Sequence, residues 1–395
     1  MALIGAWGGH RDDERLVTGS IPGRGPVAVS VAGSRISRVE PIESEGAVTL
    51  IPGLLDLQVN GYGGIDLNDG AVTPERLADL IRALRSVGVT GFCPTFVTAP
   101  VHELVASLRS VAALMEDEPH LAHSVLGVHL EGPWISARDG ARGAHAARHV
   151  RPATLAELDL LTQTGAPISI ITVAPEAAGV IDLIPEVVRR GIVVSIGHSA
   201  ADPSTIAAAV EAGATMSTHL GNGVAAELPR HPNLIWSQLA SDALWASFIA
   251  DGHHVDSEPM SVFLKAKGLD RSLLVSDTVA IAGLAAGTYE SSIGDVVELS
   301  DSGRLSLAGT SYLAGAVRTL LDGVAWLVDS HILGHSDAVR LATANPAALL
   351  GARVADRGRI GVGCVADLVR VDFSGARPRV LEVIVGGVTV SGVAT

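Results

Sequence analysis

Cysteine is nearly absent from this chain of 395 residues. Only Cys93 and Cys364 occur, far apart in the sequence and outside any C-x-x-C pattern. Disulfide frameworks and cysteine-based zinc sites need several closely spaced thiols, so the sequence indicates neither. A chain with so few thiols fits a reducing compartment, and we expect a cytoplasmic protein.

Aromatic and basic residues are also scarce. Aromatic residues make up 3% of a chain that is 48% hydrophobic, so the core must consist mainly of Ala, Val, Leu and Ile. Acidic residues outnumber basic ones by 42 to 28, giving a net charge of -14. Nucleic acids and anionic membranes are bound through basic surfaces, so we expect neither as a partner. A single Arg can still hold one phosphate group at hydrogen-bond range.

Long hydrophobic runs are missing as well. The N-terminus lacks the basic start and the apolar stretch of a signal peptide, and charged residues follow from position 11. No segment is long and apolar enough to span a bilayer. The high apolar fraction therefore predicts a large buried core.

The two ends of the chain share one pattern and the middle has another. Up to about residue 50 and from about residue 356, short alternating runs are separated by Gly and Pro, which is typical of β-strands. Between them, eight apolar runs rich in β-branched residues alternate with Ala- and Leu-rich segments, at residues 50–59, 88–98, 124–132, 168–176, 192–199, 215–220, 247–254 and 272–278. One segment, Pro74 to Leu84, carries an N-cap in Thr73 and apolar residues at helical spacing.

Eight strand-and-helix repeats predict an α/β protein with a (β/α)8 TIM barrel. We assign residues 51–355 to this barrel. Residues 1–50 and 356–395 are predicted to form a small β-sandwich domain from both chain termini. Such barrels keep their catalytic residues at the carboxyl ends of the strands.

Three potential metal ligands lie at the ends of three of these runs. They are Glu131 in HLEGP, His198 in GHS and His219 in THLGN. A carboxylate and two neutral imidazoles suit one divalent metal ion that keeps a position open for water. Each residue alone could be a hydrogen-bonded core residue, but together at strand ends they predict a metal site. Zinc is the first expectation from the ligand types, and Fe, Mn or Co would accept the same set.

Four further polar residues lie at the ends of the expected strands. Asp277 could take a proton from water and return it to a leaving amine, or could instead cap a helix. Gln58 and Asn60 are two residues apart on one strand and so point into the same barrel mouth. Neutral amides are poor zinc ligands, which favours one metal ion over two. His129 shares the strand face of Glu131 and is expected to support the ligands.

An ordered set of motifs covers nearly the whole chain: DLQVNGYGG, GVHLEGPWIS, RGAH, GHSAA, THLGN, IADGHHVD, VSDT, LAGT and TANPAALLG. Together they resemble the N-acetylglucosamine-6-phosphate deacetylases of the amidohydrolase superfamily. The resemblance implies a hydrolase that removes acetate from an N-acetyl amino sugar, most often N-acetylglucosamine 6-phosphate. It implies metal binding by Glu131, His198 and His219, acid and base catalysis by Asp277, and a single-metal site beside Gln58 and Asn60.

The resemblance also implies substrate contacts. By position, the residues concerned are His145, Asn222, Gly223, His254, Leu307, Ala308 and Gly309. His145 and His254 have an alternative as exposed loop residues. Arg230 lies where the family places an arginine that holds the sugar phosphate across a dimer interface, which implies a homodimer. Its alternative is a surface charge.

One segment departs from the family pattern. After the TH motif the family has an aromatic residue and then Asn-Ala-Met, whereas this chain has Gly221, Asn222, Gly223 and Val224. We expect an altered pocket floor, which would admit a different sugar. An amidohydrolase acting on a different or unphosphorylated N-acyl sugar therefore stays open. A catalytically silent sugar-binding barrel is disfavoured, because a binding protein has no need of Asp277.

Overall fold

Eight parallel strands form the centre of the computed structural model, which describes residues 14–43, 48–70, 72–290 and 296–392. In sheet order from one edge they run β14-β13-β12-β11-β10-β9-β8-β5. Their bounds are β5 (Leu54–Val59), β8 (Val89–Val97), β9 (Val128–Glu131), β10 (Ile168–Val173), β11 (Val193–Ile196), β12 (Met216–Ser217), β13 (Trp245–Ile249) and β14 (Ser272–Val275). Seven of them lie within the predicted runs, and β13 begins two residues before its run at 247–254.

The sheet closes where β14 returns to β5. Val59 and Thr278 form a parallel bridge across this seam. The amide of Asp277 donates to the carbonyl oxygen of Gln58 at 3.0 Å, and the amide of Asn60 donates to that of Thr278 at 2.9 Å. The predicted (β/α)8 barrel is confirmed, and its seam brings residues from the two ends of the barrel segment side by side.

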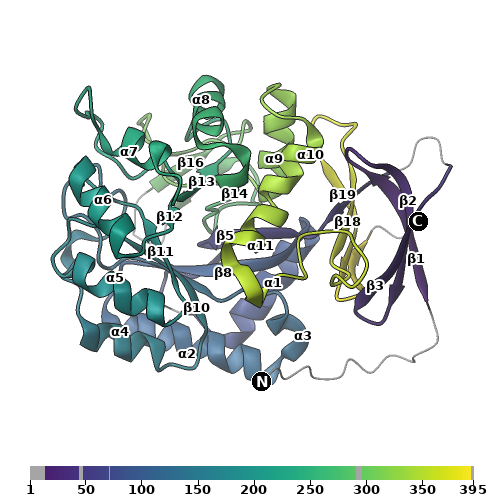
Figure 1. Ribbon diagram of the computed structural model, residues 1–395, viewed down its shortest axis with the longest axis horizontal. Helices are drawn as coiled ribbons and strands as arrows, with labels where there is room; N and C mark the ends of the chain where they lie inside the picture. Colours follow the sequence, from purple (N-terminus) through teal and green to yellow (C-terminus); the bar gives the residue numbers. More distant parts are fainter. Residues whose placement is uncertain (1–13, 44–47, 71, 291–295, 393–395) are drawn as a thin grey trace.

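Helices surround the barrel (Figure 1). The main ones are α1 (Pro74–Ser86), α2 (Val101–Asp117), α4 (Leu155–Thr162), α5 (Val180–Arg189), α6 (Pro203–Ala212), α7 (Leu234–Ala240), α8 (Ser257–Lys267) and α9 (Leu320–Asp329). Shorter ones are α3 (Pro119–Ala122), α10 (His335–Leu341), α11 (Ala344–Leu350), η1 (Ala147–His149), η2 (Leu269–Arg271) and η3 (Gly351–Arg353). Helix α1 begins as predicted, because the Thr73 side chain accepts from the amide of Arg76. Among the described residues, no helix has both the length and the apolar character to cross a membrane.

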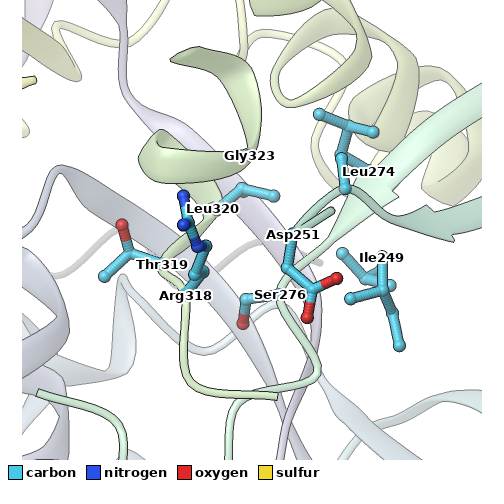
Figure 2. A pocket seen from close by; sticks show the side chains of 10 residues that line it. Ile249, Asp251, Leu274, Ser276, Arg318, Thr319, Leu320 and Gly323 are labelled. Carbon is cyan, nitrogen blue, oxygen red and sulfur yellow. The ribbon is translucent and has the colours of Figure 1, made fainter. Parts of the chain in front are cut away.

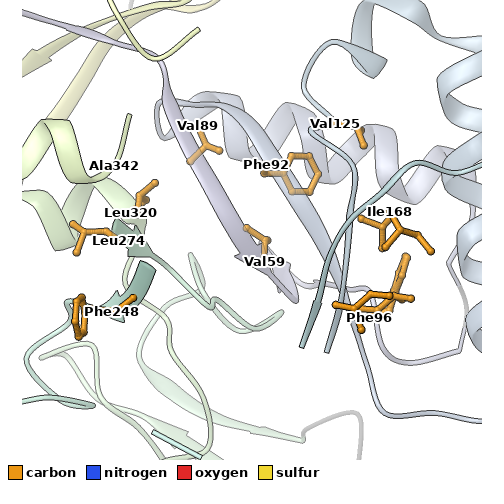
Figure 3. Close-up of a cluster of buried hydrophobic side chains, with 14 of the residues drawn as sticks. Val59, Val89, Phe92, Phe96, Val125, Ile168, Phe248, Leu274, Leu320 and Ala342 are labelled. Atoms are coloured by element: carbon orange, nitrogen blue, oxygen red, sulfur yellow. The ribbon is translucent and has the colours of Figure 1, made fainter. Parts of the chain in front are cut away.

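The core has two layers because strand side chains alternate between the faces of the sheet. Leu274 faces the outer layer, which packs between strands and helices and also contains Phe92, Phe96 and Phe248 (Figure 3). Its neighbour Leu273 belongs instead to a second buried cluster with Leu55, Leu57, Ile170 and Met216. Aliphatic side chains dominate both clusters, as the composition requires.

The eighth strand departs from the simple alternation. A three-stranded antiparallel sheet, of β15 (Gly287–Glu290), β16 (Val296–Leu299) and β17 (Leu305–Leu307), lies between β14 and α9. A short hairpin of β6 (Gly61–Tyr62) and β7 (Ile65–Asp66) follows β5. This insertion separates the eighth strand from the helix α9 that follows it, and it carries the predicted Leu307 to Gly309 loop.

Both termini build the second unit, seen as purple and yellow strands at the right of Figure 1. Its seven strands run in the order β20-β19-β18-β4-β1-β2-β3. Their bounds are β1 (Arg15–Ile21), β2 (Gly25–Ala32), β3 (Arg35–Pro41), β4 (Thr49–Pro52), β18 (Leu368–Asp372), β19 (Arg379–Val385) and β20 (Val388–Gly392). The small β domain from both termini is confirmed. Its boundaries at residues 50 and 356 stay predictions, because β4 continues almost directly into β5.

A buried ion pair joins the C-terminal segment to the barrel. Arg357 donates to the Asp367 carboxylate at 2.9 Å and to the carbonyl oxygens of His123 and Thr90 at 2.7 and 3.1 Å. Asp367 also accepts from the amide of Gly386 at 2.8 Å and lies 3.1 Å from the His123 ring. Burial alone would raise the pKa of Asp367, but Arg357, His123 and the Gly386 amide outweigh it and hold that pKa well below its usual value. The pair is therefore ionised across the neutral range.

We expect Asp367→Asn to destabilise the protein by about 3–5 kcal/mol at pH 7, because it leaves a buried guanidinium without its counter-charge. The folded-state pKa of Asp367 lies below its unfolded value of about 3.9, so its stabilisation is complete above about pH 4 and is lost as the pH falls further. Urea unfolding at several pH values measures this. Asp79→Asn, which breaks the exposed pair with Arg82, is the control and should cost less than about 1 kcal/mol. A stability gap that did not shrink below pH 4 would contradict the assignment.

Candidate active site

Three of the predicted site residues share an unusual backbone conformation. His198, His219 and Asp277 follow β11, β12 and β14 closely and have φ angles of 49°, 31° and 52°. His331 is the other described non-glycine residue with a positive φ. Side chains other than Gly rarely adopt this region, at a cost of about 1–3 kcal/mol each, and such strain concentrates at functional sites. The backbone thus turns sharply at the ends of these three strands, at the residues that carry the site side chains.

Glu131, at the end of β9, is the centre of the cluster. Its Oε1 accepts from the Gln58 amide at 2.9 Å and lies 3.0 Å from Nε2 of His219 and 3.2 Å from Nε2 of His198. Nε2 of His145 lies 3.8 Å from Oε2. Burial alone would raise the pKa of Glu131, but the hydrogen bonds and charges of His198 and His219 hold it well below its usual value. The group is a buried carboxylate facing imidazoles.

The His198 ring is held in one orientation. Its Nδ1 donates to the carbonyl oxygen of Ala141 at 3.1 Å, so Nε2 is the ring nitrogen that faces Glu131. Two glycines flank the ring: a Cβ at Gly143 would lie 3.0 Å from its Cε1, and one at Gly223 would lie 2.8 Å from its Nδ1. Gly223 therefore makes room for an imidazole as well as shaping the pocket floor.

His145 differs from the other two imidazoles. Its Nδ1 lies 2.9 Å from the Thr98 hydroxyl oxygen and 3.4 Å from the Thr98 backbone nitrogen. Burial and then the neighbouring His198 lower the pKa of His145 to about 3, so the ring is neutral. Its Nε2, 3.8 Å from Oε2 of Glu131, is the ring nitrogen that faces the cluster. With 6% of its surface exposed, it is not the solvent-exposed loop residue of the alternative interpretation.

Asp277 and Asn60 meet across the barrel seam. The Asn60 amide donates to Asp277 Oδ1 at 2.7 Å. Burial and then the charge of Glu131 raise the pKa of Asp277 to about 6. A carboxyl group with this pKa can both hold and release a proton near neutral pH. Asp277 does not cap a helix, because the next described helix is α9.

His129 lies beside this cluster without bonding to it. Its Nδ1 donates to the carbonyl oxygen of Leu57 at 3.0 Å, and its Nε2 accepts from the Thr172 hydroxyl at 2.7 Å. Burial lowers the pKa of His129 to about 4, so the ring is neutral. None of its hydrogen bonds in the described chain goes to Glu131, His198 or His219. Its supporting role stays a prediction that acts through the neighbouring strands.

The remaining predicted contacts are less closely tied to the cluster. Asn222 donates to the carbonyl oxygen of His219 at 3.3 Å, and the His254 side chain is 12% exposed and bonded to Asp251. Arg230 is exposed, in the segment that precedes α7. Leu307 ends β17, and Ala308 and Gly309 begin the turn after it; the three residues are half-buried to exposed. No hydrogen bond among the described residues links them or Arg230 to the Glu131 cluster.

In the segment that departs from the family pattern, the space beside Gly221 is occupied by an aromatic ring. A Cβ at Gly221, where the family pattern has an aromatic residue, would lie 3.0 Å from Cε2 of Phe263. Phe263 comes from α8 and stacks on Phe248 with 6.0 Å between ring centroids. An aromatic ring from another element thus occupies the space beside Gly221, and the glycine does not simply enlarge the pocket.

Sequence reasoning missed two buried carboxylates, one within β5 and one just after β13. Asp56 accepts from the amides of Ser276 and Gln58 at 3.1 and 3.4 Å, which ties β14 to β5. Burial raises the pKa of Asp56 to about 7. Asp251 accepts from the ring of His254 at 2.7 Å. Both have a sequence signal, because each lies a few residues before a predicted site residue on the same run.

The cluster fits a divalent metal ion. Glu131, His145 and His198 have ligand atoms within 4.8 Å of one another, and Nε2 of His219 lies 3.2 Å from Nε2 of His198. The Nε2 atoms of His198 and His219 and Oε1 of Glu131 therefore lie within hydrogen-bond distance of each other. The lone pairs of two imidazole nitrogens cannot bond to one another, but they can bind the same cation. Nδ1 of His219 is also buried without a hydrogen-bond partner among the described residues. This donor set is what ions of borderline hardness prefer.

Comparisons with known proteins agree with this geometry. The model of the amidohydrolase family matches residues 49–390. The chain is 35% identical to the N-acetylglucosamine-6-phosphate deacetylase of Bos taurus, over 83% of this chain and 81% of that one. It is 32% identical to the N-acetylgalactosamine-6-phosphate deacetylase of Shewanella sp. (strain ANA-3), over 86% of this chain and 82% of that one.

Solved structures extend the likeness to three dimensions. An N-acetyl-D-glucosamine-6-phosphate deacetylase variant from Mycobacterium smegmatis, in complex with N-acetyl-D-glucosamine-6-phosphate, matches with a TM-score of 0.84 and 27% identity, covering 95% of this chain and 99% of that one. The Thermotoga maritima N-acetylglucosamine-6-phosphate deacetylase matches with a TM-score of 0.83 and 28% identity, covering 96% and 100%. With a family match over most of its length and these relatives, the chain belongs to the amidohydrolase family and, within it, to the N-acetylglucosamine-6-phosphate deacetylases.

Proposed function

We propose that this protein is a metal-dependent deacetylase that hydrolyses the acetamide of an N-acetylhexosamine 6-phosphate. The first candidate substrate is N-acetylglucosamine 6-phosphate, which with water gives glucosamine 6-phosphate and acetate. One observation carries the proposal, namely the arrangement around the buried Glu131 carboxylate. Nε2 of His198 and Nε2 of His219 lie within 3.2 Å of it. Asp277 lies close enough for the charge of Glu131 to help raise its pKa to about 6.

Glu131, His198 and His219 would hold a single metal ion. Because its Nδ1 hydrogen is donated to Ala141, a neutral His198 would offer the lone pair of Nε2 to the ion. Gln58 and Asn60 carry neutral amides and would not hold a second ion. A bound divalent ion polarises a carbonyl group and lowers the pKa of a water molecule. Zinc is the first candidate from the ligand types, with Fe, Mn and Co as alternatives.

Asp277 performs the proton transfers in this proposal. Its carboxylate takes a proton from the attacking water and then gives it to the departing amine, so the base of one step is the acid of the next. Asn60 holds Oδ1 at 2.7 Å and leaves Oδ2 for the proton. Cleavage of the C–N bond then releases acetate and the free amine, with no other reactant required.

The remaining residues would bind the substrate. His145, whose Nε2 lies 3.8 Å from Oε2 of Glu131, would contact the substrate there. Asn222, Gly223, His254, Leu307, Ala308 and Gly309 would contact the sugar. Arg230, exposed on its loop, would hold the 6-phosphate across the interface of a homodimer. Few thiols and a phosphorylated sugar substrate together favour the cytoplasm.

The identity of the hexosamine has one specific alternative. Curated relatives include both N-acetylglucosamine-6-phosphate and N-acetylgalactosamine-6-phosphate deacetylases at 30–35% identity. The segment from Gly221 to Val224 departs from the family pattern, and Phe263 partly refills it. N-acetylgalactosamine 6-phosphate is therefore the second candidate substrate.

Replacing the central carboxylate tests the metal site. We expect Glu131→Gln to lose the bound ion and to lower acetate release by about 10³-fold or more, since a metal contributes several kcal/mol to such a reaction. Elemental analysis of the purified protein and an acetate assay measure both. His102→Gln, at a side chain that is 79% exposed, is the matched control and should keep one ion per chain. Full metal content in Glu131→Gln would contradict the ligand assignment.

Removing the proton acceptor separates chemistry from metal binding. Asp277→Asn should keep its metal, because Asp277 is not among the three ligands, while kcat falls about 10²- to 10⁴-fold. Metal analysis and steady-state kinetics on the same preparation make the comparison. Turnover at the level of the unmodified protein would remove Asp277 from the mechanism.

Substrate preference tests the phosphate contact. Arg230→Ala should raise KM for N-acetylglucosamine 6-phosphate by about 10- to 100-fold, as expected for the loss of a charged hydrogen bond, and leave unphosphorylated N-acetylglucosamine unaffected. A substrate panel that also includes N-acetylgalactosamine 6-phosphate gives the hexosamine preference. Arg189→Ala, at a side chain that is 72% exposed on α5, is the control. Equal effects on phosphorylated and unphosphorylated sugars would count against Arg230.

A further inference from the structure

Asp251 is a buried carboxylate just after β13, with 4% of its surface exposed. Its Oδ1 accepts from the backbone amides of His253 and His254, both at 2.8 Å. Its Oδ2 lies 2.7 Å from Nδ1 of His254. Two amides therefore fix the carboxylate, and the remaining oxygen is aimed at one imidazole nitrogen.

The carboxylate is ionised. Burial alone would raise the pKa of Asp251, but the hydrogen bond and charge of His254 and the two backbone amides hold it below its usual value. Asp251 also lines a cavity of about 10 Å³ with Ser276 and Arg318 (Figure 2). This is room for about one water molecule. The guanidinium of Arg318 also lines this cavity. Its Nε is buried without a hydrogen-bond partner among the described residues.

An ionised carboxylate can only accept hydrogen bonds. The 2.7 Å contact therefore places a hydrogen on Nδ1 of His254 and leaves Nε2 on the opposite edge of the ring. A protonated His254 would lower the pKa of Asp277, so the two side chains lie within electrostatic range of each other. The edge of His254 that carries Nε2 thus belongs to the same strand-end region as the proton-transfer residue.

We propose that Asp251 is a positioning residue, which holds His254 in the tautomer with hydrogen on Nδ1 so that a bare Nε2 accepts a hydrogen bond from an N–H or O–H group of the amino sugar. The inference rests on the proposed deacetylase function for its substrate. The Asp251–His254 pair itself is independent of that function. Metal-ligating and general-base histidines use the same device, in which a carboxylate on one ring nitrogen decides what the other nitrogen can do.

Asp251→Asn tests the tautomer directly. The Asn oxygen can keep the two backbone amides, while its NH₂ group faces Nδ1 and forces the hydrogen onto Nε2. Imidazole ¹⁵N chemical shifts, assigned with His254→Gln, should show Nδ1–H in the unmodified protein and Nε2–H in the variant. An Nε2–H tautomer in the unmodified protein would overturn the proposal even if the variant did not fold.

Kinetics show whether the tautomer matters for substrate. Asp251→Asn should lower kcat/KM by about 10- to 100-fold at unchanged metal content, because a donor replaces an acceptor in the site. In a His254→Gln background the same change should have no further effect, since Asp251 acts through His254. His253→Gln is the matched control, because that neighbouring ring only approaches the Ser302 carbonyl oxygen at 3.4 Å, and kcat/KM should not change.

Two results would overturn this role. The first is a switched tautomer with unchanged kcat/KM, and the second is a full additional loss in the double variant. Failure of the proposed function looks different, because the unmodified protein would then release no acetate while the ¹⁵N shifts still reported the state of His254.

Discussion

The charge of one buried carboxylate organises the mouth of this barrel. Glu131 is removed from water, and its ionised form persists because Gln58, His198 and His219 all approach one of its oxygens within 3.2 Å. An isolated buried carboxylate would be protonated instead. The same charge raises the pKa of Asp277 and, against the effect of burial, that of His219. Loss of this charge would therefore lower the pKa of both groups.

The backbone cooperates with this charge arrangement. His198, His219 and Asp277 adopt left-handed φ angles where their strands end, and only the surrounding packing can offset that strain. Glycines beside His198 leave no room for a Cβ, so the ring position is decided by steric exclusion as much as by hydrogen bonding. The site is thus rigid before any ligand binds, which favours catalysis through preorganised groups.

Much of this architecture could be predicted because strand periodicity and strand-end chemistry are local signals. The eight strands, the α1 N-cap at Thr73 and the grouping of Glu131 with His198 and His219 follow from them. The insertion after β14 could not be predicted, because its strands are short and their sequence resembles that of a loop. Asp56 and Asp251 were missed because their position shortly before a predicted site residue does not show that the carboxylate is buried. The proximity of His145 to Glu131 depends on how a loop folds back, which periodicity does not encode.

The seam between β5 and β14 has a consequence for biosynthesis. Asn60 and Asp277 are separated by 217 positions, so their contact cannot form until most of the polypeptide has left the ribosome. Closing so large a loop costs entropy and slows folding. Nascent chains with seven strands would expose the edges of β5 and β13 and would lack the proton-transfer residue. Activity should therefore emerge only in the last stage of synthesis, when a chaperone protecting that open edge would matter most.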